Sequence, residues 1–84
     1  MKRYTIGKMA KLNNVTEQTL RLYDKMGLFK PAYVDEHNGY RLYDIGQSAR
    51  LDIIQYLKNL GMTLKENQKK FLEFKKFRII TGKN

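Results

Sequence analysis

The sequence predicts a small, mainly α-helical domain with a small β-hairpin. Apolar residues recur at helical spacing on both sides of a Tyr-rich stretch, residues 32–43, that surrounds an Asn-Gly pair. The chain has 84 residues, which is enough for one domain with a modest hydrophobic core and no more.

The composition excludes several classes of protein. The chain has no Cys, which rules out disulfides, zinc-thiolate sites and iron–sulfur clusters, and its single His37 cannot form a multi-histidine metal site. We therefore expect neither a metal nor a cofactor. The longest apolar run, residues 32–34, is too short to cross a membrane, and Lys8 and Lys11 interrupt any signal-peptide core. These features predict a soluble, cytoplasmic protein.

The chain is strongly basic. Lys and Arg outnumber Asp and Glu by 17 to 8, which gives a formal net charge of +9, and more than half of the excess lies in residues 62–84. A basic balance favours a polyanionic partner, either a nucleic acid or an anionic membrane surface. Charge alone does not distinguish these two partners.

Two short helices are predicted near the N-terminus. The spacing of apolar residues places the first at about residues 5–12. Thr16 is a suitable N-cap for the second helix, which reaches about Met26. Gly27 is placed to end this helix in a left-handed conformation, and Pro31 prevents the helix from resuming.

The junction between these helices has the pattern of a helix-turn-helix. Ala10 is the small residue at which the two helices touch, and four residues later Asn14 occupies a turn that needs left-handed geometry. Val15, Leu20 and Tyr23 then fall where the second helix must be held against the core. The alternative is an ordinary helical hairpin, which the spacing leaves open.

A β-hairpin is predicted next, with strands at Ala32–Val34 and Tyr40–Tyr43 and a turn at residues 35–39. A hairpin beside a helix-turn-helix is a wing, so the predicted fold is a winged helix-turn-helix. Arg41 lies beside the turn, where Arg side chains of a wing can donate hydrogen bonds to phosphates. The alternative is that the tyrosines only pack the sheet against the helices, and Tyr43 is expected in the core.

The third helix is predicted to follow a capping box formed by Asp44 and Gln47. Gly61 is placed to end it. Its apolar stripe is expected to comprise Ile53, Ile54, Leu57 and Leu60.

A fourth helix is predicted to begin near Leu64. Thr63 and Glu66 repeat the capping-box pattern immediately around this position. The apolar face of this helix is weak, because Asn67 and Gln68 stand where apolar residues are expected.

The exposed face of the second helix is suited to reading DNA. A recognition helix contacts base edges with its N-terminal residues, and here those are Gln18 and then Arg21. Gln pairs bidentately with adenine, and Arg with guanine or a phosphate. Leu22 is an apolar side chain on this polar face and suits a thymine methyl, a sugar or a partner surface. The alternative is a solvated face without a ligand, which Glu17 and Lys25 fit equally well.

These motifs belong to a longer pattern that covers residues 3–66. Its segments are Tyr4–Lys8, Thr19–Leu28, Gly39–Tyr43, Asp44–Ile45 and Leu57–Leu64. With these segments at this spacing, the chain resembles the DNA-binding domain of MerR-type bacterial transcription regulators. Residues 28–31 are most similar to the branch that includes multidrug-sensing activators.

The resemblance implies a winged helix-turn-helix DNA-binding domain over residues 1–66. The second helix would enter the major groove, the wing would follow the backbone, and the third helix would add a basic contact. The implied contacts are Thr19, Arg21, Leu22, Tyr23, Arg41 and Lys58, with Tyr40 nearby. Together with Thr16 and Gln18 of the second helix, these are the candidate DNA-binding residues.

The resemblance also implies a mode of action. Proteins of this type bind as homodimers to near-palindromic double-stranded DNA between the −35 and −10 promoter elements, and they distort the spacer so that RNA polymerase can use it. Leu22 departs from the pattern, since close relatives often have Tyr there. Residues 67–84 are expected to form a basic C-terminal helix or tail, atypical or truncated relative to the family's dimerisation helix.

Two other functions are compatible with the sequence. One is an excisionase-like architectural DNA-binding protein that needs no effector. The other is an interaction module whose basic, Phe-rich residues 71–78 dock on a protein groove or an acidic membrane. Enzymatic activity is not expected and no residue is assigned a catalytic role, because Ser48 has no His nearby in the sequence and no glycine-rich phosphate loop is present. We expect double-stranded DNA, and not a membrane, as the partner.

Overall fold

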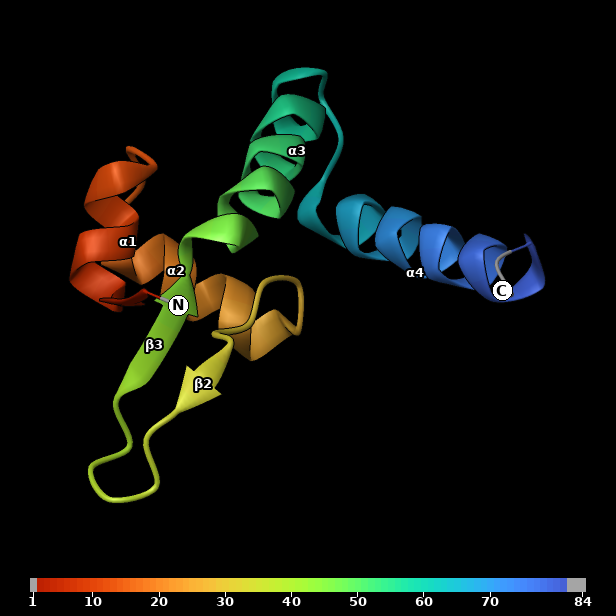
Figure 1. The fold of residues 1–84 in the computed structure, drawn as a ribbon. Coiled ribbons are helices and arrows are strands. Elements are labelled where there is room, and N and C mark those ends of the chain that lie inside the picture. Colours follow the sequence, from red (N-terminus) through yellow and green to blue (C-terminus); the bar gives the residue numbers. More distant parts are fainter. Residues whose placement is uncertain (1, 82–84) are drawn as a thin grey trace. The chain divides into compact units, whose positions relative to one another are not determined.

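The computed structural model describes the backbone of residues 2–81 and the side chains of residues 2–73 (Figure 1). In chain order the elements are β1 (Arg3–Thr5), α1 (Ile6–Leu12), α2 (Glu17–Met26), β2 (Tyr33–Val34), β3 (Arg41–Asp44), the 3-10 helix η1 (Ile45–Gln47), α3 (Ser48–Asn59) and α4 (Leu64–Thr81). The chain divides into two compact units, residues 1–53 and 54–84, with the boundary inside α3. The expected domain boundary after residue 66 stays a prediction.

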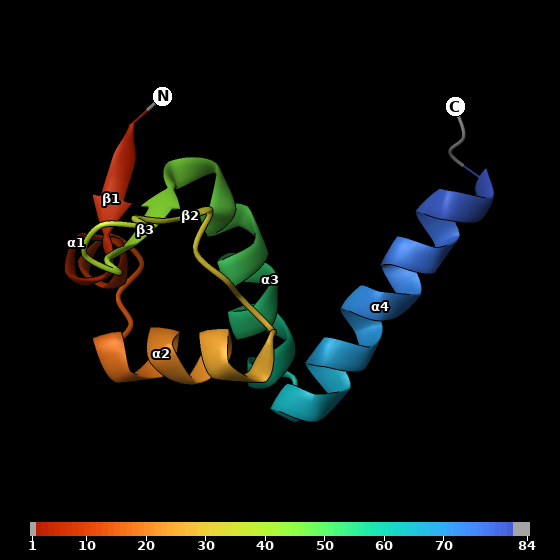
Figure 2. The same ribbon diagram turned by 90° about the horizontal axis from the view of Figure 1, so that it is seen from below.

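The first unit contains the predicted helix-turn-helix. Figure 2 shows α1 end-on and α2 from the side, so the two helices cross. At the N-cap of α2, the Oγ1 of Thr16 accepts a hydrogen bond from the backbone N–H of Thr19 at 3.0 Å. Asn14 has φ of 55° and Gly27 has φ of 77°, so both residues adopt the left-handed conformation that the sequence predicted.

The sheet has three strands, where the sequence predicted only a hairpin. The antiparallel order is β1-β3-β2, with Tyr4 opposite Tyr43 and Tyr33 opposite Leu42. β1 was missed because three residues are too few to show a period of two. Its pairing with β3, distant in the sequence, decides its conformation.

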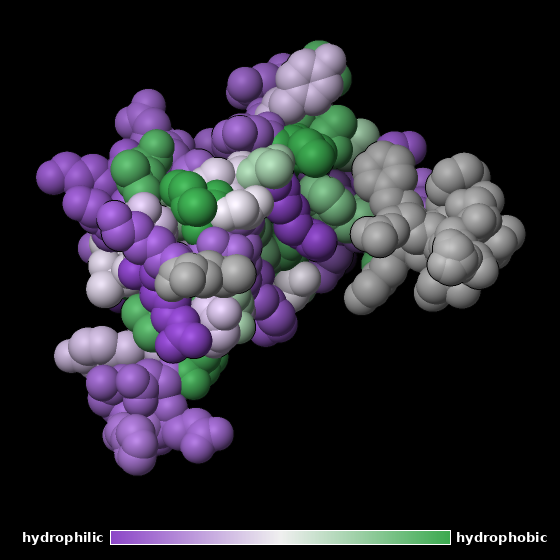
Figure 3. Space-filling view, viewed as in Figure 1, coloured by the Kyte–Doolittle hydropathy of each residue, from purple (hydrophilic) through white to green (hydrophobic). Residues whose placement is uncertain are grey.

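The hairpin between β2 and β3 forms around the predicted turn. The backbone N–H of Asp35 donates to the carbonyl of Tyr40 at 2.9 Å, and that of Gly39 donates to the carbonyl of Asp35 at 2.7 Å. Gly39 has φ of 71°, a left-handed conformation that favours glycine. In Figure 3, hydrophilic side chains gather over this projecting hairpin.

The core of the first unit joins both helices to the sheet. The rings of Phe29 and Tyr43 stack with centroids 5.7 Å apart, which confirms that Tyr43 is a core residue. Val15 is only partly buried, and Tyr40 is exposed. The buried apolar residues of this unit are Met9, Ala10, Leu20, Tyr23, Leu28, Phe29, Tyr43 and Leu51.

The apolar stripe predicted for α3 is partly wrong. Ile54 is buried and Leu57 is partly buried, but Ile53 is 43% exposed and Leu60 is 67% exposed. The buried positions begin at Leu51 and continue three residues later at Ile54, whereas Ile53 lies about 100° away from Ile54 on the helix. The sequence alone did not show which of the adjacent apolar residues faces the core.

The second unit contains the end of α3 and the long helix α4. The predicted capping box is present: the backbone N–H of Glu66 donates to Thr63 Oγ1 at 3.1 Å, and that of Thr63 donates to Glu66 Oε1 at 2.8 Å. Asn67 is fully buried and donates through Nδ2 to the Thr63 carbonyl at 3.2 Å. A polar residue therefore occupies the inward face of α4, as the sequence indicated.

Part of the Phe-rich segment expected to form an interaction module lies outside the described side chains. Phe71 is partly buried, whereas Phe74 and Phe77 are among the side chains that the structure does not describe. Across residues 2–81, no helix combines the length and the apolar character needed to cross a membrane.

The turn between α1 and α2 gives a stability prediction. Asn14→Val should lower the free energy of unfolding by about 1–2 kcal/mol, because a β-branched side chain is strained at positive φ. Asn14→Gly removes the side chain without that strain and is the control, with an expected change close to zero. Urea denaturation followed by circular dichroism measures both variants. Equal losses in the two would mean that side-chain contacts, and not backbone strain, determine the effect.

Candidate nucleic-acid interface

α2 presents a polar face to solvent and holds its opposite face in the core. Leu20 and Tyr23 are fully buried, whereas Gln18, Arg21 and Leu22 are exposed. This is the division of faces that helical spacing predicts. Leu22, at 46% exposure, is an apolar side chain on the solvent face.

Glu17 engages Arg21 on this face. Arg21 Nη2 lies 3.3 Å from Glu17 Oε1, one helical turn away, and both side chains are more than half exposed. The other carboxylate oxygen lies close to α1, because a Cβ added at Gly7 would be only 3.0 Å from Glu17 Oε2. The missing side chain at Gly7 thus leaves room for the carboxylate that pairs with Arg21.

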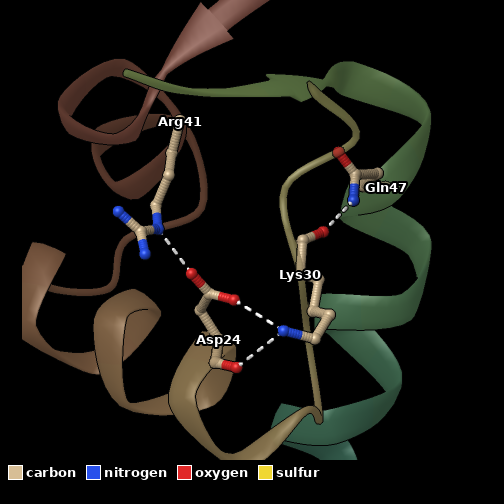
Figure 4. A network of polar contacts seen from close by, with 4 residues as sticks. All are labelled: Asp24, Lys30, Arg41 and Gln47. Carbon is tan, nitrogen blue, oxygen red and sulfur yellow. Dashed lines mark hydrogen bonds and ion pairs between the residues drawn. The ribbon is translucent and has the colours of Figure 1, made fainter. Parts of the chain in front are cut away.

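Asp24 connects α2 with the wing (Figure 4). Arg41 Nε, on β3, donates to Asp24 Oδ2 at 2.5 Å. Lys30 Nζ, in the loop before β2, donates to Asp24 Oδ1 at 3.1 Å and to the Asp24 carbonyl at 3.2 Å. The Asp24 side chain is only 12% exposed, whereas those of Arg41 and Lys30 are 45% and 65% exposed. One nearly buried carboxylate therefore holds two cations at the surface.

The loop that contains Lys30 is fixed from the other side by residues near the start of α3. Gln47 Nε2 donates to the Lys30 carbonyl at 2.6 Å (Figure 4), and Arg50 Nε donates to the Leu28 carbonyl at 3.1 Å. Both bonds satisfy backbone carbonyls of a segment that has no ladder partner of its own. They leave the ammonium group of Lys30 directed at Asp24.

The surroundings of Asp24 keep it ionised. Partial burial raises its pKa, but the hydrogen bonds and positive charges of Arg41 and Lys30 together outweigh burial, so the pKa lies below its usual value. The same pair raises the pKa of Arg41, chiefly through the hydrogen bond to Asp24. Burial raises the pKa of the neighbouring Tyr43 hydroxyl, which stays neutral.

Two hollows lie where α2 meets the wing. The basic hollow has a volume of about 420 Å³ and is lined by Arg21, Asp24, Lys25, Lys30 and Arg41. The wing hollow has a volume of about 310 Å³ and is lined by Thr5, Ile6, Arg21, Gly39, Tyr40 and Arg41. Arg21 and Arg41 line both, so the structure brings the exposed cation of α2 and the cation of the wing to one surface. Four cations and one carboxylate line the basic hollow, which suits an anion such as a phosphate.

The other candidate residues lie in three different settings. The hydroxyls of Thr16 and Thr19 are 2.8 Å apart and take part in capping α2. Tyr23 is 0% exposed, so its side chain lies in the core and is not accessible to a DNA duplex. Lys58 is exposed in the last turn of α3, within the second unit.

Sequence reasoning gave no role to two residues of this surface, Asp24 and Lys30. Asp24 lies three residues after Arg21, so helical spacing by itself would pair these two, yet Arg21 pairs with Glu17. The contact of Asp24 with Arg41 spans 17 positions and has no local signal in the sequence. Among the described residues, no group of His, Asp and Glu side chains could hold a metal ion.

The ion pairs of Asp24 give a prediction about pH. Because the folded-state pKa of Asp24 is lowered, its ion pairs stabilise the fold fully above the unfolded value near 3.8 and lose this effect as pH falls through the folded-state pKa. Asp24→Asn should therefore cost about 1 kcal/mol at pH 7, and the difference from wild type should shrink below about pH 4. Thermal unfolding from pH 7 to 3 measures it. A difference that stays constant with pH would show that the carboxylate charge does not stabilise the fold.

The family model described as the MerR HTH family of regulatory proteins matches residues 4–73. The multidrug-efflux transporter 1 regulator of Bacillus subtilis (strain 168) is 50% identical over 66 residues, which are 79% of this chain and 24% of that protein. The chain spans about a quarter of the length of this relative and of the multidrug-efflux transporter 2 regulator of the same organism.

Solved structures share the fold. A MerR-family transcriptional regulator from Bacillus cereus has a TM-score of 0.75 and 38% identity, over 84% of this chain and 52% of that chain. HiNmlR, a MerR family regulator lacking the sensor domain and bound to promoter DNA, has a TM-score of 0.73 and 37% identity, over 81% of this chain and 53% of that chain. The predicted winged helix-turn-helix is thereby confirmed. The chain belongs to the MerR HTH family of regulatory proteins.

Proposed function

We propose that this domain binds double-stranded DNA with sequence specificity, as the promoter-binding part of a MerR-type transcription regulator. The observation that supports this most strongly is the placement of Arg21 on α2 and Arg41 on the wing at the same hollows. Cations presented by a helix and a hairpin on one surface can engage the major groove and the adjacent backbone of one duplex.

In this proposal the exposed side chains divide into two kinds of contact. Gln18 and Arg21 read base edges, and Leu22 contacts a thymine methyl or a sugar. Arg41 and Tyr40 of the wing contact backbone phosphates, which sets the register of the protein on the duplex. Lys58, which is exposed, and the capping residues Thr16 and Thr19 make further contacts with the DNA backbone in this proposal. Tyr23 makes none, because its side chain is buried.

For the whole regulator, we propose action as a homodimer at a promoter spacer in the cytoplasm. Distortion of the DNA would align the promoter elements for RNA polymerase, and the cost of bending would add selectivity at bases that no side chain touches. The relative HiNmlR, solved bound to promoter DNA, supports a promoter as the target. The relatives are transcriptional regulators, and we propose no catalytic step for this chain.

Selection of bound duplexes from random double-stranded DNA tests this function. At about 0.15 M salt, where surface charges are screened as in a cell, the 84-residue chain should enrich a defined sequence. An inverted repeat would indicate a dimer, and a single half-site would indicate a monomer. Absence of any enriched sequence would contradict sequence-specific binding and favour an architectural protein.

Substitution of the two arginines tests the division of roles. Arg21→Ala should weaken binding to the selected site by about 1–3 kcal/mol and relax specificity at one base pair. Arg41→Ala should weaken binding to all sequences and reduce the slope of log K against log salt by about one. Fluorescence anisotropy with the selected and a shuffled duplex measures both effects. An equal loss on both duplexes for Arg21→Ala would assign that residue to phosphate contact.

A further inference from the structure

We propose that Asp24 is a positioning residue, whose carboxylate orients Arg41 of the wing so that the domain distinguishes its own site from other DNA. This inference rests on the proposed function, because it concerns how the same surface binds a duplex. Asp24 itself does not touch DNA in this proposal, and it acts through the side chain of Arg41.

The geometry of the pair leaves the functional end of Arg41 available. Asp24 takes the Nε–H of Arg41, and within the part of the chain that the structure describes, the two terminal nitrogens of Arg41 make no hydrogen bond or ion pair. A guanidinium group is planar and rigid. Fixing Nε therefore fixes the direction of the two terminal nitrogens, which can then donate to a phosphate.

Asp24 is itself held firmly. It lies on α2 directly after the fully buried Tyr23, its side chain is only 12% exposed, and its second oxygen binds Lys30. Arg41 begins β3 on the far side of the hairpin turn. The bond therefore ties the wing to the helix that reads the bases, and it fixes the distance between the two sets of DNA contacts.

The charges around Asp24 argue against a simple role as a competitor for phosphate. The basic hollow retains three more cations than carboxylates with Asp24 ionised, so it still attracts an anion. Removing the carboxylate would raise the positive charge further, and non-specific attraction to DNA would not fall. The phosphate contact of Arg41 would become less precise, and this contact sets the register of the protein on its specific site.

Asp24→Asn in the full chain tests this inference by anisotropy, with the selected duplex and a shuffled duplex of equal length. Affinity for the selected duplex should fall about tenfold, within the range for coupled neighbours. Affinity for the shuffled duplex should stay the same or rise. Asp52→Asn is the matched control: Asp52 is exposed on α3 with no ion pair among the described residues, and the same change of charge there should leave the ratio of affinities unchanged.

Two further variants separate positioning from a general loss of structure. In an Arg41→Ala background, Asp24→Asn should change the ratio of affinities for the two duplexes less than about twofold, because the side chain through which Asp24 acts is absent. Arg41→Lys keeps the charge but loses the planar group, so it should lower discrimination as Asp24→Asn does while the salt dependence stays the same. Arg41→Lys leaves the bond between Asp24 and Lys30 in place. The ratio of affinities can therefore be measured with this variant even if Asp24→Asn unfolds.

The outcomes distinguish this inference from the proposed function. If wild type does not distinguish the two duplexes, the proposed function and the inference both fail. If wild type does so and a folded Asp24→Asn keeps the full ratio, only the inference fails. If Asp24→Asn unfolds, a full ratio for Arg41→Lys overturns the inference in the same way. An equal effect of Asp24→Asn with and without Arg41 would also overturn it.

Discussion

Asp24 accepts hydrogen bonds from Arg41 of β3 and from Lys30 of the loop before β2, so its carboxylate joins α2 to that loop and to the start of β3. The arrangement of the exposed cations of α2 and the wing depends on this contact, because the hairpin has only two short strands and projects away from α1 and α2 (Figure 1). The two cations are largely exposed, so the ion pairs add only about 1 kcal/mol to the stability of the fold. Their main effect is to hold long cationic side chains in one direction.

A second acidic residue acts in the same way on α2. Glu17 holds Arg21, and the glycine at position 7 makes space for its carboxylate. In a chain of net charge +9, acidic residues beside the exposed arginines lower the local positive charge and reduce the freedom of the arginine side chains. In the proposed function, both effects would favour specific over non-specific binding to DNA, since non-specific binding depends mainly on charge.

Two independent observations concern the surface formed by α2 and the wing. The match to the MerR HTH family covers both α2 and the wing, and the hollows between these elements are lined by Arg21 and Arg41. The family pattern also assigned Tyr23 to DNA, whereas its side chain lies wholly in the core. A resemblance transfers a position along the chain, but only packing decides whether the side chain at that position reaches the surface.

Features that depend on neighbours within one helical turn could be predicted from the sequence. Thr16 and Thr63 cap their helices as predicted, and Asn14 and Gly27 adopt left-handed geometry, because each acts on backbone groups a few positions away. Three features follow only from packing between distant segments: strand β1, the inward face of α3 and the pairing of Asp24 with Arg41. These features depend on segments that meet only after folding, so the local periodicity of the sequence does not predict them.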